Sequence, residues 1–213
     1  KYSFNLTYTD SKFESDQKNL ISYMSKLNEY FVKNMNEGKS QDSINYLKSR
    51  NLEGVDIKEF KIGFAEKNES DTLKFINTLG ISKNELRNLG LLSDKGNLLF
   101  KNRIIFPITN LRNDTIGFGG RAIEDFGPKY INSAESGVYK KNRALYFTDN
   151  FLSVVKKKKF VILVEGYFDV IAFNKLGYAN VAPPSGTALT VQQLNLLSRY
   201  TKDIYICFDN DTA

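Results

Sequence analysis

The sequence predicts an α/β protein, with an α+β N-terminal subdomain followed by a smaller part built on a parallel, Rossmann-like sheet. Two patterns support this prediction. The first ninety residues contain short amphipathic segments, and β-rich segments follow at 103–108 and 115–123. Residues 161–208 then alternate apolar strands and helices in the order β-α-β-α-β, which is typical of a parallel sheet with right-handed crossovers.

Helices are predicted over most of the first ninety residues. Apolar side chains recur every three or four positions from residue 17 to 35, which indicates one buried helix face. Ser40 is suited to cap a helix that runs to Arg50, and Asp56 to cap a short turn that runs to Phe60. Two further helices are expected over 71–79 and after Ser82.

The β-rich segment and the lysines after it suggest how the chain is divided. Pro107 predicts that strand 103–108 lies at a sheet edge or contains a bulge, and residues 124–150 show little regular pattern. Four consecutive lysines, 156–159, suggest a solvated connection. We therefore expect a tail or linker at 1–16, an N-terminal subdomain at 17–155 and a second subdomain at 156–213.

The second subdomain is predicted to hold three strands and two helices. The strands are expected at 161–164, 180–182 and 204–208, and the first helix at 167–176. Thr190 is expected to cap the other helix, whose inward residues would be Val191, Leu194 and Leu197.

Composition narrows the possible chemistry. The 213 residues include one cysteine and no histidine, which excludes a disulfide framework, a Cys/His zinc site and histidine catalysis within them. No apolar run is long enough to span a bilayer, so no membrane partner is expected, and a cytoplasmic location follows by default. The net charge of +6 mildly favours a polyanionic partner such as nucleic acid.

Carboxylates follow two of the predicted parallel strands. Glu165 comes after the first strand, and Asp209 and Asp211 come after the third. If these strands are neighbours, the three acids converge on one edge, where their repulsion calls for a cation, and oxygen ligands favour Mg²⁺ or Mn²⁺. Asp169 is either an additional metal ligand or a residue that interacts with a helix dipole. The alternative is that each acid is a loop residue or helix cap.

Basic and glycine-rich segments precede this region. Taken alone, Gly117 to Arg121 is best interpreted as a strand that allows close backbone approach, because it lacks the spacing of a nucleotide-binding loop. Basic residues could bind phosphates, and the interleaved tyrosines 130, 139 and 146 could stack on bases. These basic residues are Arg103, Arg121, Lys129, Lys141 and Arg143. The alternative is a solvated basic surface with tyrosines packed beneath it.

Several segments resemble the bacterial DnaG-type DNA primases. E-G-Y-F-D (165–169) with F-D-N-D (208–211) is similar to the Toprim pattern. N-R-I-I-F-P-I (102–108), I-G-F-G-G-R-A (116–122), P-K-Y-I-N-S (128–133), Y-K-K-N-R-A-L-Y (139–146) and S-G-T-A-L-T (185–190) narrow the resemblance to primases. Toprim nucleases and topoisomerases lack the G-F-G-G-R and P-K-Y-I-N-S blocks.

The resemblance implies an RNA polymerase core that makes short RNA primers on single-stranded DNA from ribonucleoside triphosphates. It implies Mg²⁺ or Mn²⁺ on Glu165, Asp209 and Asp211. It also implies a groove between the two subdomains. The nucleotide- and template-binding candidates are Arg103, Arg121, Lys129, Tyr130, Asn132, Lys141, Arg143, Gly186 and Thr187.

The resemblance also implies parts that these residues lack. The family carries an N-terminal zinc-binding domain, a third acidic motif after the D-x-D, and a C-terminal domain that binds the replicative helicase. The sequence is therefore expected to be the first part of the core, truncated within the Toprim subdomain and inactive by itself. A Toprim nuclease or topoisomerase fragment and a non-catalytic binding module are the rival interpretations.

Overall fold

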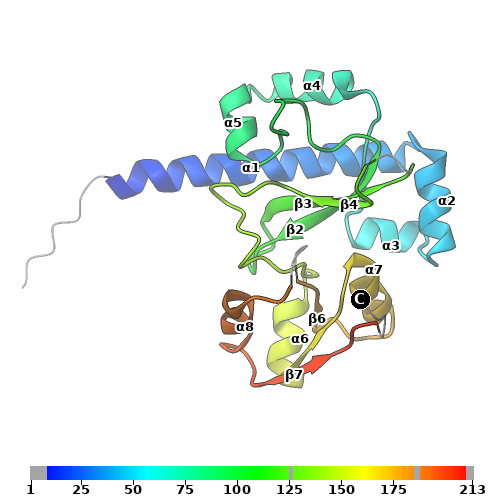
Figure 1. Ribbon diagram of the computed structural model, residues 1–213, viewed down its shortest axis with the longest axis vertical. Helices are drawn as coiled ribbons and strands as arrows, with labels where there is room; N and C mark the ends of the chain where they lie inside the picture. The colour runs from blue at the N-terminus through cyan, green and yellow to red at the C-terminus, as the bar shows by residue number, and fades with distance from the viewer. Residues whose placement is uncertain (1–8, 125–126, 185–187, 210–213) are drawn as a thin grey trace, which may run out of the picture.

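Two β-sheets form the centre of the computed structural model, which describes residues 9–124, 127–184 and 188–209. The antiparallel sheet has the strand order β1-β2-β3-β4 and the parallel sheet the order β6-β5-β7. Figure 1 shows helices packed around both sheets. The strands are β1 (Gly63–Ala65), β2 (Arg103–Thr109), β3 (Thr115–Ala122), β4 (Tyr130–Asn132), β5 (Phe160–Leu163), β6 (Val181–Ala182) and β7 (Asp203–Ile206). The helices are α1 (Thr9–Asn36), α2 (Gln41–Ser49), α3 (Gly54–Glu59), α4 (Glu69–Thr78), α5 (Lys83–Asn88), α6 (Phe151–Lys158), α7 (Tyr167–Lys175) and α8 (Val191–Leu197).

The helices of the first ninety residues form as predicted, but three of them start earlier than expected. Helix α4 begins at Glu69 rather than residue 71. Helix α1 begins at Thr9 rather than residue 17, because its first turns are polar and carry no apolar periodicity. Helix α3 begins at Gly54, so Asp56 is its third residue and not its cap. The Asp56 carboxylate instead accepts a hydrogen bond from the backbone N–H of Glu53, at 2.7 Å. Ser40 and Ser82 cap α2 and α5 as expected.

Strands β1, β2 and β3 of the antiparallel sheet are buried on both faces, with Arg121 of β3 only partly buried, while β4 is partly exposed. Side chains alternate along β2, so Ile105 packs toward α1 while Ile104 and Phe106 pack toward α7. This explains why β2 is apolar throughout instead of alternating with polar residues.

Strand β2 is not an edge strand. It pairs with β1 through residues 103–105 and with β3 along its length. Pro107 lies beyond the end of β1 and pairs only with Phe118, so the missing N–H costs no hydrogen bond to a second neighbour. The proline therefore marks a local edge, which is followed by a register shift at Ile108/Thr109.

Three further features differ from the predictions. Strands β1 and β4 were not predicted, because three residues are too few to show an alternating pattern. The lysines at 156–158 form the last turn of α6 and do not belong to a connecting loop, and Lys159 caps the helix with φ +64°. Lysine favours helix, and its charge is stabilising near a helix C-terminus. The expected subdomain boundary at 155/156 falls within this helix.

The parallel sheet has β5 at its centre, between β6 and β7. Helices α6 and α8 cover one face of β5 and α7 covers the other. Thr190 caps α8 as expected, but Val191 is 69% exposed and does not face the core. Gln193 is buried in its place, and its Nε2 donates to the carbonyl oxygens of Ala144 (2.7 Å) and Lys141 (3.2 Å).

Aromatic side chains join the two sheets. The Tyr167 ring, at the start of α7, stacks on Phe106 of β2 with ring centroids 4.8 Å apart and meets Tyr146 edge-on at 4.9 Å. One apolar core therefore continues from the antiparallel sheet into the parallel one. Among the described residues, no helix is both long and apolar enough to cross a bilayer.

Candidate metal and phosphate site

Glu165 and Asp209 lie together at the carboxyl edge of the parallel sheet. Their strands are adjacent and in register, with Leu163 beside Ile206, so each acid follows its strand by a few residues. The backbone N–H of Asp209 donates to Oε1 of Glu165 at 2.8 Å. Both side chains are exposed. The expected convergence of the two strand ends is confirmed, while Asp211 lies outside the described residues.

Asp169 caps the helix that starts beside these acids. Its Oδ2 accepts the backbone N–H of Gly166 at 2.9 Å, which satisfies a donor at the start of α7. Gly166 itself is extended, with φ −146°, so it needs no left-handed backbone there. Asp169 thus makes a capping contact, and its other carboxylate oxygen has no hydrogen bond to the described residues.

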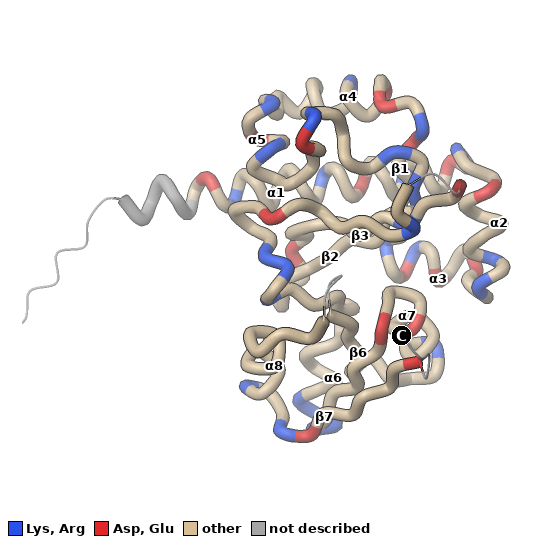
Figure 2. The backbone as a smooth tube through the Cα atoms, viewed as in Figure 1, with Lys and Arg blue, Asp and Glu red and all other residues tan. Residues whose placement is uncertain are grey.

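Glu165 and Asp209 line a pocket of about 430 Å³ whose two walls carry opposite charges. The parallel-sheet side contributes Glu165, Asp169 and Asp209. The facing side contributes Lys129 and Arg50, together with Tyr130 and Asn132. In Figure 2, acidic positions gather beside α7 and basic positions lie across from them. A metal cation and an anionic group can therefore bind side by side here.

A hydrogen bond ties the two walls of the pocket together. The hydroxyl of Tyr167 donates to Oδ1 of Asn132 at 2.7 Å. Burial raises the pKa of Tyr167 well above its ordinary value, so the phenol keeps its proton and acts as the donor. With its oxygen engaged, Asn132 is left with an amide N–H₂ to offer to a ligand.

Arg121 lies beside the basic wall, stacked on aromatic rings. Its guanidinium is 3.8 Å from the Tyr46 ring centroid and 5.9 Å from that of Tyr130. Desolvation raises the pKa of Tyr130, and the nearby charges of Arg121 and Arg50 partly oppose this shift. The Nε of Arg121 is buried and has no hydrogen-bond partner among the described residues. The stacking fixes the guanidinium plane and leaves its charge available.

The carboxylates fit a hard divalent cation. Within the described part of the chain, no lysine or arginine forms an ion pair with Glu165 or Asp209. Two unpaired carboxylates at one sheet edge supply the oxygen ligands that Mg²⁺ and Mn²⁺ prefer. The described residues include no cluster of three or more acidic, cysteine or histidine ligands, so Asp211 would have to supply the third.

Family models cover both parts of the chain. The model described as "DNA primase catalytic core, N-terminal domain" matches residues 30–151, which is more than half of the chain. The chain belongs to the DNA primase family. A second model, described as Toprim-like, matches residues 162–213, so the predicted family and its Toprim part are both confirmed.

Relatives and solved structures agree with this assignment. The DNA primases of Rickettsia bellii and Campylobacter jejuni are 36% and 37% identical to this chain over 98% and 99% of its length. Each match covers 35% of the relative, so this primase chain spans about a third of its relatives' length. The zinc-binding and RNA polymerase domains of Aquifex aeolicus primase superpose with a TM-score of 0.83 at 35% identity, covering 92% of this chain and 49% of that one. The catalytic core of Escherichia coli primase gives a TM-score of 0.79 at 30% identity, over 90% of this chain and 63% of that one.

Three predicted binding residues of this primase chain, Arg103, Lys141 and Arg143, do not line the charged pocket. Arg103 is buried, and its Nη1 donates to the carbonyl oxygens of Gly120 (3.2 Å) and Lys129 (3.5 Å). Burial lowers the pKa of Arg103. Arg143 lines a different pocket, and the backbone of Lys141 is bound to Glu135 and Gln193. Gly186 and Thr187 lie outside the described residues.

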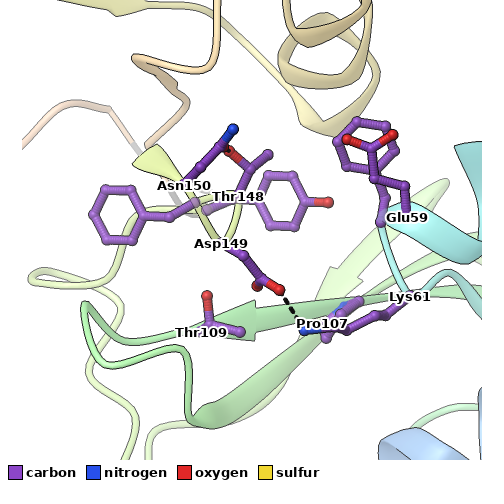
Figure 3. Close-up of a pocket in the computed structure, with 10 residues that line it drawn as sticks. Glu59, Lys61, Pro107, Thr109, Thr148, Asp149 and Asn150 are labelled. Atoms are coloured by element: carbon purple, nitrogen blue, oxygen red, sulfur yellow. Dashed lines mark hydrogen bonds and ion pairs between the residues drawn. The ribbon is translucent and has the colours of Figure 1, made fainter. Parts of the chain in front are cut away.

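The joint between the sheets holds a separate pocket of about 210 Å³. Figure 3 shows Lys61 and Asp149 facing each other across it, with Nζ and Oδ2 2.7 Å apart. Tyr146, one of the tyrosines suggested for base stacking, lines this pocket. Tyr146 and Tyr139 are both buried in the core, so neither is exposed to stack on a base. The ion pair links the α3–β1 connection to the segment before α6. We therefore interpret this pocket as part of the packing between the two sheets.

One charged residue that lines this pocket was not predicted from the sequence. Arg50 reaches the basic wall from the end of α2, more than seventy residues before Lys129. The sequence offered no motif for it, because an arginine at a helix end is common. Only the packing of α2 beside α7 brings it to the site, as the contact between Tyr46 and Phe168 indicates.

Proposed function

We propose that this chain is catalytic-core sequence of a primase that synthesises short RNA primers on single-stranded DNA during replication. The observation that carries the proposal is the pocket in which Glu165 and Asp209 face Lys129 and Asn132. Nucleotidyl transfer needs both the acidic and the basic wall of this pocket, because it combines a divalent metal with a triphosphate that carries several negative charges. The membership in the primase family supplies the reaction class.

The metal is proposed to be Mg²⁺ or Mn²⁺, held by Glu165 and Asp209. Asp211 is proposed as a further ligand from its D-x-D spacing alone. When bound, the ion would lower the pKa of the attacking 3′-hydroxyl and neutralise charge at the α-phosphate. Asp169 would act mainly through its cap, which fixes the start of α7 beside Glu165.

The basic wall is proposed to hold the ribonucleoside triphosphate. Lys129 supplies charge, and the amide of Asn132 supplies directed donors once Tyr167 has engaged its oxygen. Arg121 adds a stacked cation at the rim. Arg103 would act through the carbonyl of Lys129, which keeps β4 in place beneath the nucleotide.

The template is proposed to be single-stranded DNA, bound chiefly through phosphates. Lys141 and Arg143 are proposed to contact it beyond the nucleotide, with Tyr130 nearer the reacting end. Gly186 and Thr187 are proposed as further contacts from their sequence segment alone. The solved structure of a DnaG primase catalytic domain bound to ssDNA, at 30% identity and a TM-score of 0.82 over 93% of this chain and 65% of that one, supports this partner. The replicative helicase remains an expectation for a domain outside these residues.

Primer synthesis by Glu165→Gln and Asp209→Asn proteins tests the metal assignment. In the full-length protein that carries these residues, synthesis should fall by about a hundredfold or more, because each change removes a charged metal ligand. Mn²⁺ binding, followed by electron paramagnetic resonance on the 213-residue chain, should weaken in parallel. Single-stranded DNA binding should stay near the wild-type level, since the lost carboxylates repel phosphates.

Asp203→Asn is the matched control. It removes a carboxylate from the opposite end of the same strand, β7, and should leave synthesis and Mn²⁺ binding unchanged. Primer synthesis that survives in Glu165→Gln and Asp209→Asn would overturn the metal assignment. Metal-dependent DNA cleavage by the wild type without ribonucleotides would instead favour a Toprim nuclease.

A further inference from the structure

The pocket between the two sheets has a buried floor and an exposed, charged rim. Phe60, Pro107 and Tyr146 form part of the floor, and the rim carries Lys61 and Asp149, whose side chains are 45% and 55% exposed. Its volume of about 210 Å³ has room for about seven non-hydrogen atoms, since one water molecule occupies about 30 Å³ in the liquid. It shares no lining residue with the candidate metal and phosphate site, so a ligand here would be independent of that site.

The floor of the pocket contains a threonine hydroxyl without a partner. Thr109 is 5% exposed, and its Oγ1 makes no hydrogen bond to the described residues. It follows the register shift at Ile108/Thr109, and such an irregularity changes the direction of a side chain. Figure 3 shows this hydroxyl on the side of β2 where Asp149 lies. A buried hydroxyl with no partner is unfavourable, so this one indicates that a ligand supplies a hydrogen-bonding group.

A second hydroxyl belongs to the floor. Tyr146 lines the pocket, and its hydroxyl makes no hydrogen bond to the described residues. Burial and the charge of Asp149 raise the pKa of this phenol, so it stays protonated at neutral pH. The hydroxyls of Thr109 and Tyr146 can each donate and accept a hydrogen bond. They suit a neutral polar group, because an ion would lose its hydration to reach them.

The rim of the pocket is net negative. It carries the carboxylates of Glu59 and Asp149 and the ammonium of Lys61. Lys61 is paired with Asp149 at 2.7 Å, whereas Glu59, the exposed last residue of α3, forms no ion pair with any described residue. An excess carboxylate at the mouth attracts a cation and repels a phosphate. A nucleotide or a nucleic acid strand is therefore unsuited to this pocket.

We propose that this pocket binds a small amino alcohol, with its ammonium group at Glu59 and its hydroxyl at Thr109. The ammonium stays at the exposed rim, where a carboxylate compensates its charge at little cost in desolvation. The ligand hydroxyl reaches the floor and gives the Thr109 and Tyr146 hydroxyls a partner. The carbon chain between these two groups lies against Phe60 and Pro107. Such a molecule contacts α3 and the segment before α6 at the same time.

Titration of the 213-residue chain with 4-amino-1-butanol, followed by heteronuclear NMR, tests the proposal. We expect saturable shifts of the backbone amides around Thr109 and Asp149, with a dissociation constant on the order of 1 mM for a ligand of about six non-hydrogen atoms. Butylamine lacks the hydroxyl and 1,4-butanediol lacks the charge, so each should bind at least about fivefold more weakly. 4-Hydroxybutyrate carries the opposite charge and should not bind.

Two substitutions test the two ends of the ligand separately. Thr109→Val keeps the shape of the side chain and should weaken aminobutanol binding about tenfold, while butylamine binding stays unchanged. Glu59→Gln should weaken the binding of both amines and leave that of butanediol unchanged. Glu29→Gln is the matched control: it removes an exposed carboxylate of α1, outside the pocket, and should bind aminobutanol as the wild type does.

The comparison of ligands on the wild type decides the proposal even if a variant does not fold. No saturable binding of aminobutanol, or equal binding of aminobutanol, butylamine and butanediol, would overturn it, and the pocket would then hold water only. Equal weakening by Glu59→Gln and Glu29→Gln would also overturn it, in favour of a general effect of net charge. Selective loss of aminobutanol binding in Thr109→Val, with unchanged thermal unfolding, would support it.

Discussion

At the scale of single residues, Gly119 and Tyr167 explain why two distant motifs occur together. Gly119 lies in the G-F-G-G-R segment of β3, and a Cβ there would overlap the Tyr167 hydroxyl. The phenol fills the space above the strand and reaches Asn132 on β4. The glycine therefore serves close packing, as the structural interpretation of this segment predicted.

Replacing Gly119 with alanine tests this contact. The new methyl group has no free space, so Tyr167 must move and its hydrogen bond to Asn132 is lost. We expect the free energy of unfolding to fall by about 1–3 kcal/mol, the usual cost of overpacking a core. Urea unfolding followed by circular dichroism measures it.

The matched substitution is Gly137→Ala. A Cβ at this position would meet only a Leu20 methyl group at 3.7 Å, an ordinary contact. Its effect on stability should be within about 0.5 kcal/mol. Equal destabilisation by the two substitutions would contradict the packing role of Gly119.

At the scale of elements, α7 is held at both ends. Asp169 caps its first turn, and Lys175 in its last turn bonds to Asp56 and to the carbonyl of Asn51. The first contact sets the start of the helix beside Glu165. The second fixes it to the α2–α3 connection, so the helical segment and the parallel sheet keep their relative position.

Asp56→Ala should loosen the second attachment. Burial alone would raise the pKa of Asp56, but the N–H of Glu53 and the ammonium of Lys175 lower it below 3.8. The substitution removes both contacts, and we expect a loss of about 2 kcal/mol in unfolding free energy at pH 7. Urea unfolding at several pH values measures it.

The loss of unfolding free energy caused by Asp56→Ala should become smaller as the pH falls. The pKa of Asp56 is lower in the folded state than in the unfolded state, so its carboxylate stabilises the fold at pH values above the unfolded-state pKa. This stabilisation is lost as the pH falls through the folded-state pKa. The difference between wild type and Asp56→Ala should be constant above about pH 5 and shrink below about pH 4. The exposed Asp94→Ala should show little difference at any pH. A gap between wild type and Asp56→Ala that persists undiminished at pH 3 would contradict the assignment.

Elements with a long periodic pattern could be predicted from sequence, and short or context-dependent ones could not. The apolar stripe of α1 and the caps Ser40, Ser82 and Thr190 are local signals. Strands β1 and β4 depend on partners far away in the chain. The exposure of Val191 could not be predicted either. It depends on the burial of Gln193, whose side chain donates to the carbonyl oxygen of Ala144, far away in the sequence.

At the scale of the whole molecule, the β7 edge of the parallel sheet is incompletely covered. Strand β7 lies at its edge, with Tyr205 61% and Ile206 64% exposed, and Phe208 beyond it is 44% exposed. Successive residues of a strand point to opposite sides, so β7 is exposed on both faces, and no strand of the described residues pairs with its outer edge. Such an edge favours pairing with another chain.

The 213-residue chain should therefore self-associate at high concentration through β7. Ile206→Lys places a charge on this edge and should reduce the association, as measured by sedimentation velocity. Val191→Lys is the control, since Val191 is equally exposed but lies on α8. An equal reduction of the association by both substitutions would indicate non-specific hydrophobic association and not pairing along the edge of β7.

The acidic half of the site could be predicted, because strand order alone brings Glu165 and Asp209 to one edge. The basic half was only partly predictable. Lys129, Tyr130 and Asn132 follow from the resemblance, but the positions of Arg103 and Arg143 depend on how β2, β3 and the 138–145 segment pack. Arg50 was missed because its relation to the site exists only in the tertiary structure.

The aromatic joint also gives the molecule an optical reporter. The chain contains 12 tyrosines and no tryptophan, so its near-ultraviolet absorbance and its fluorescence come mainly from phenol rings. Tyr146 and Tyr167 are buried where the two sheets meet, and burial raises the pKa of both. Their spectra therefore record the state of the junction beside the site, and they do so without any attached label.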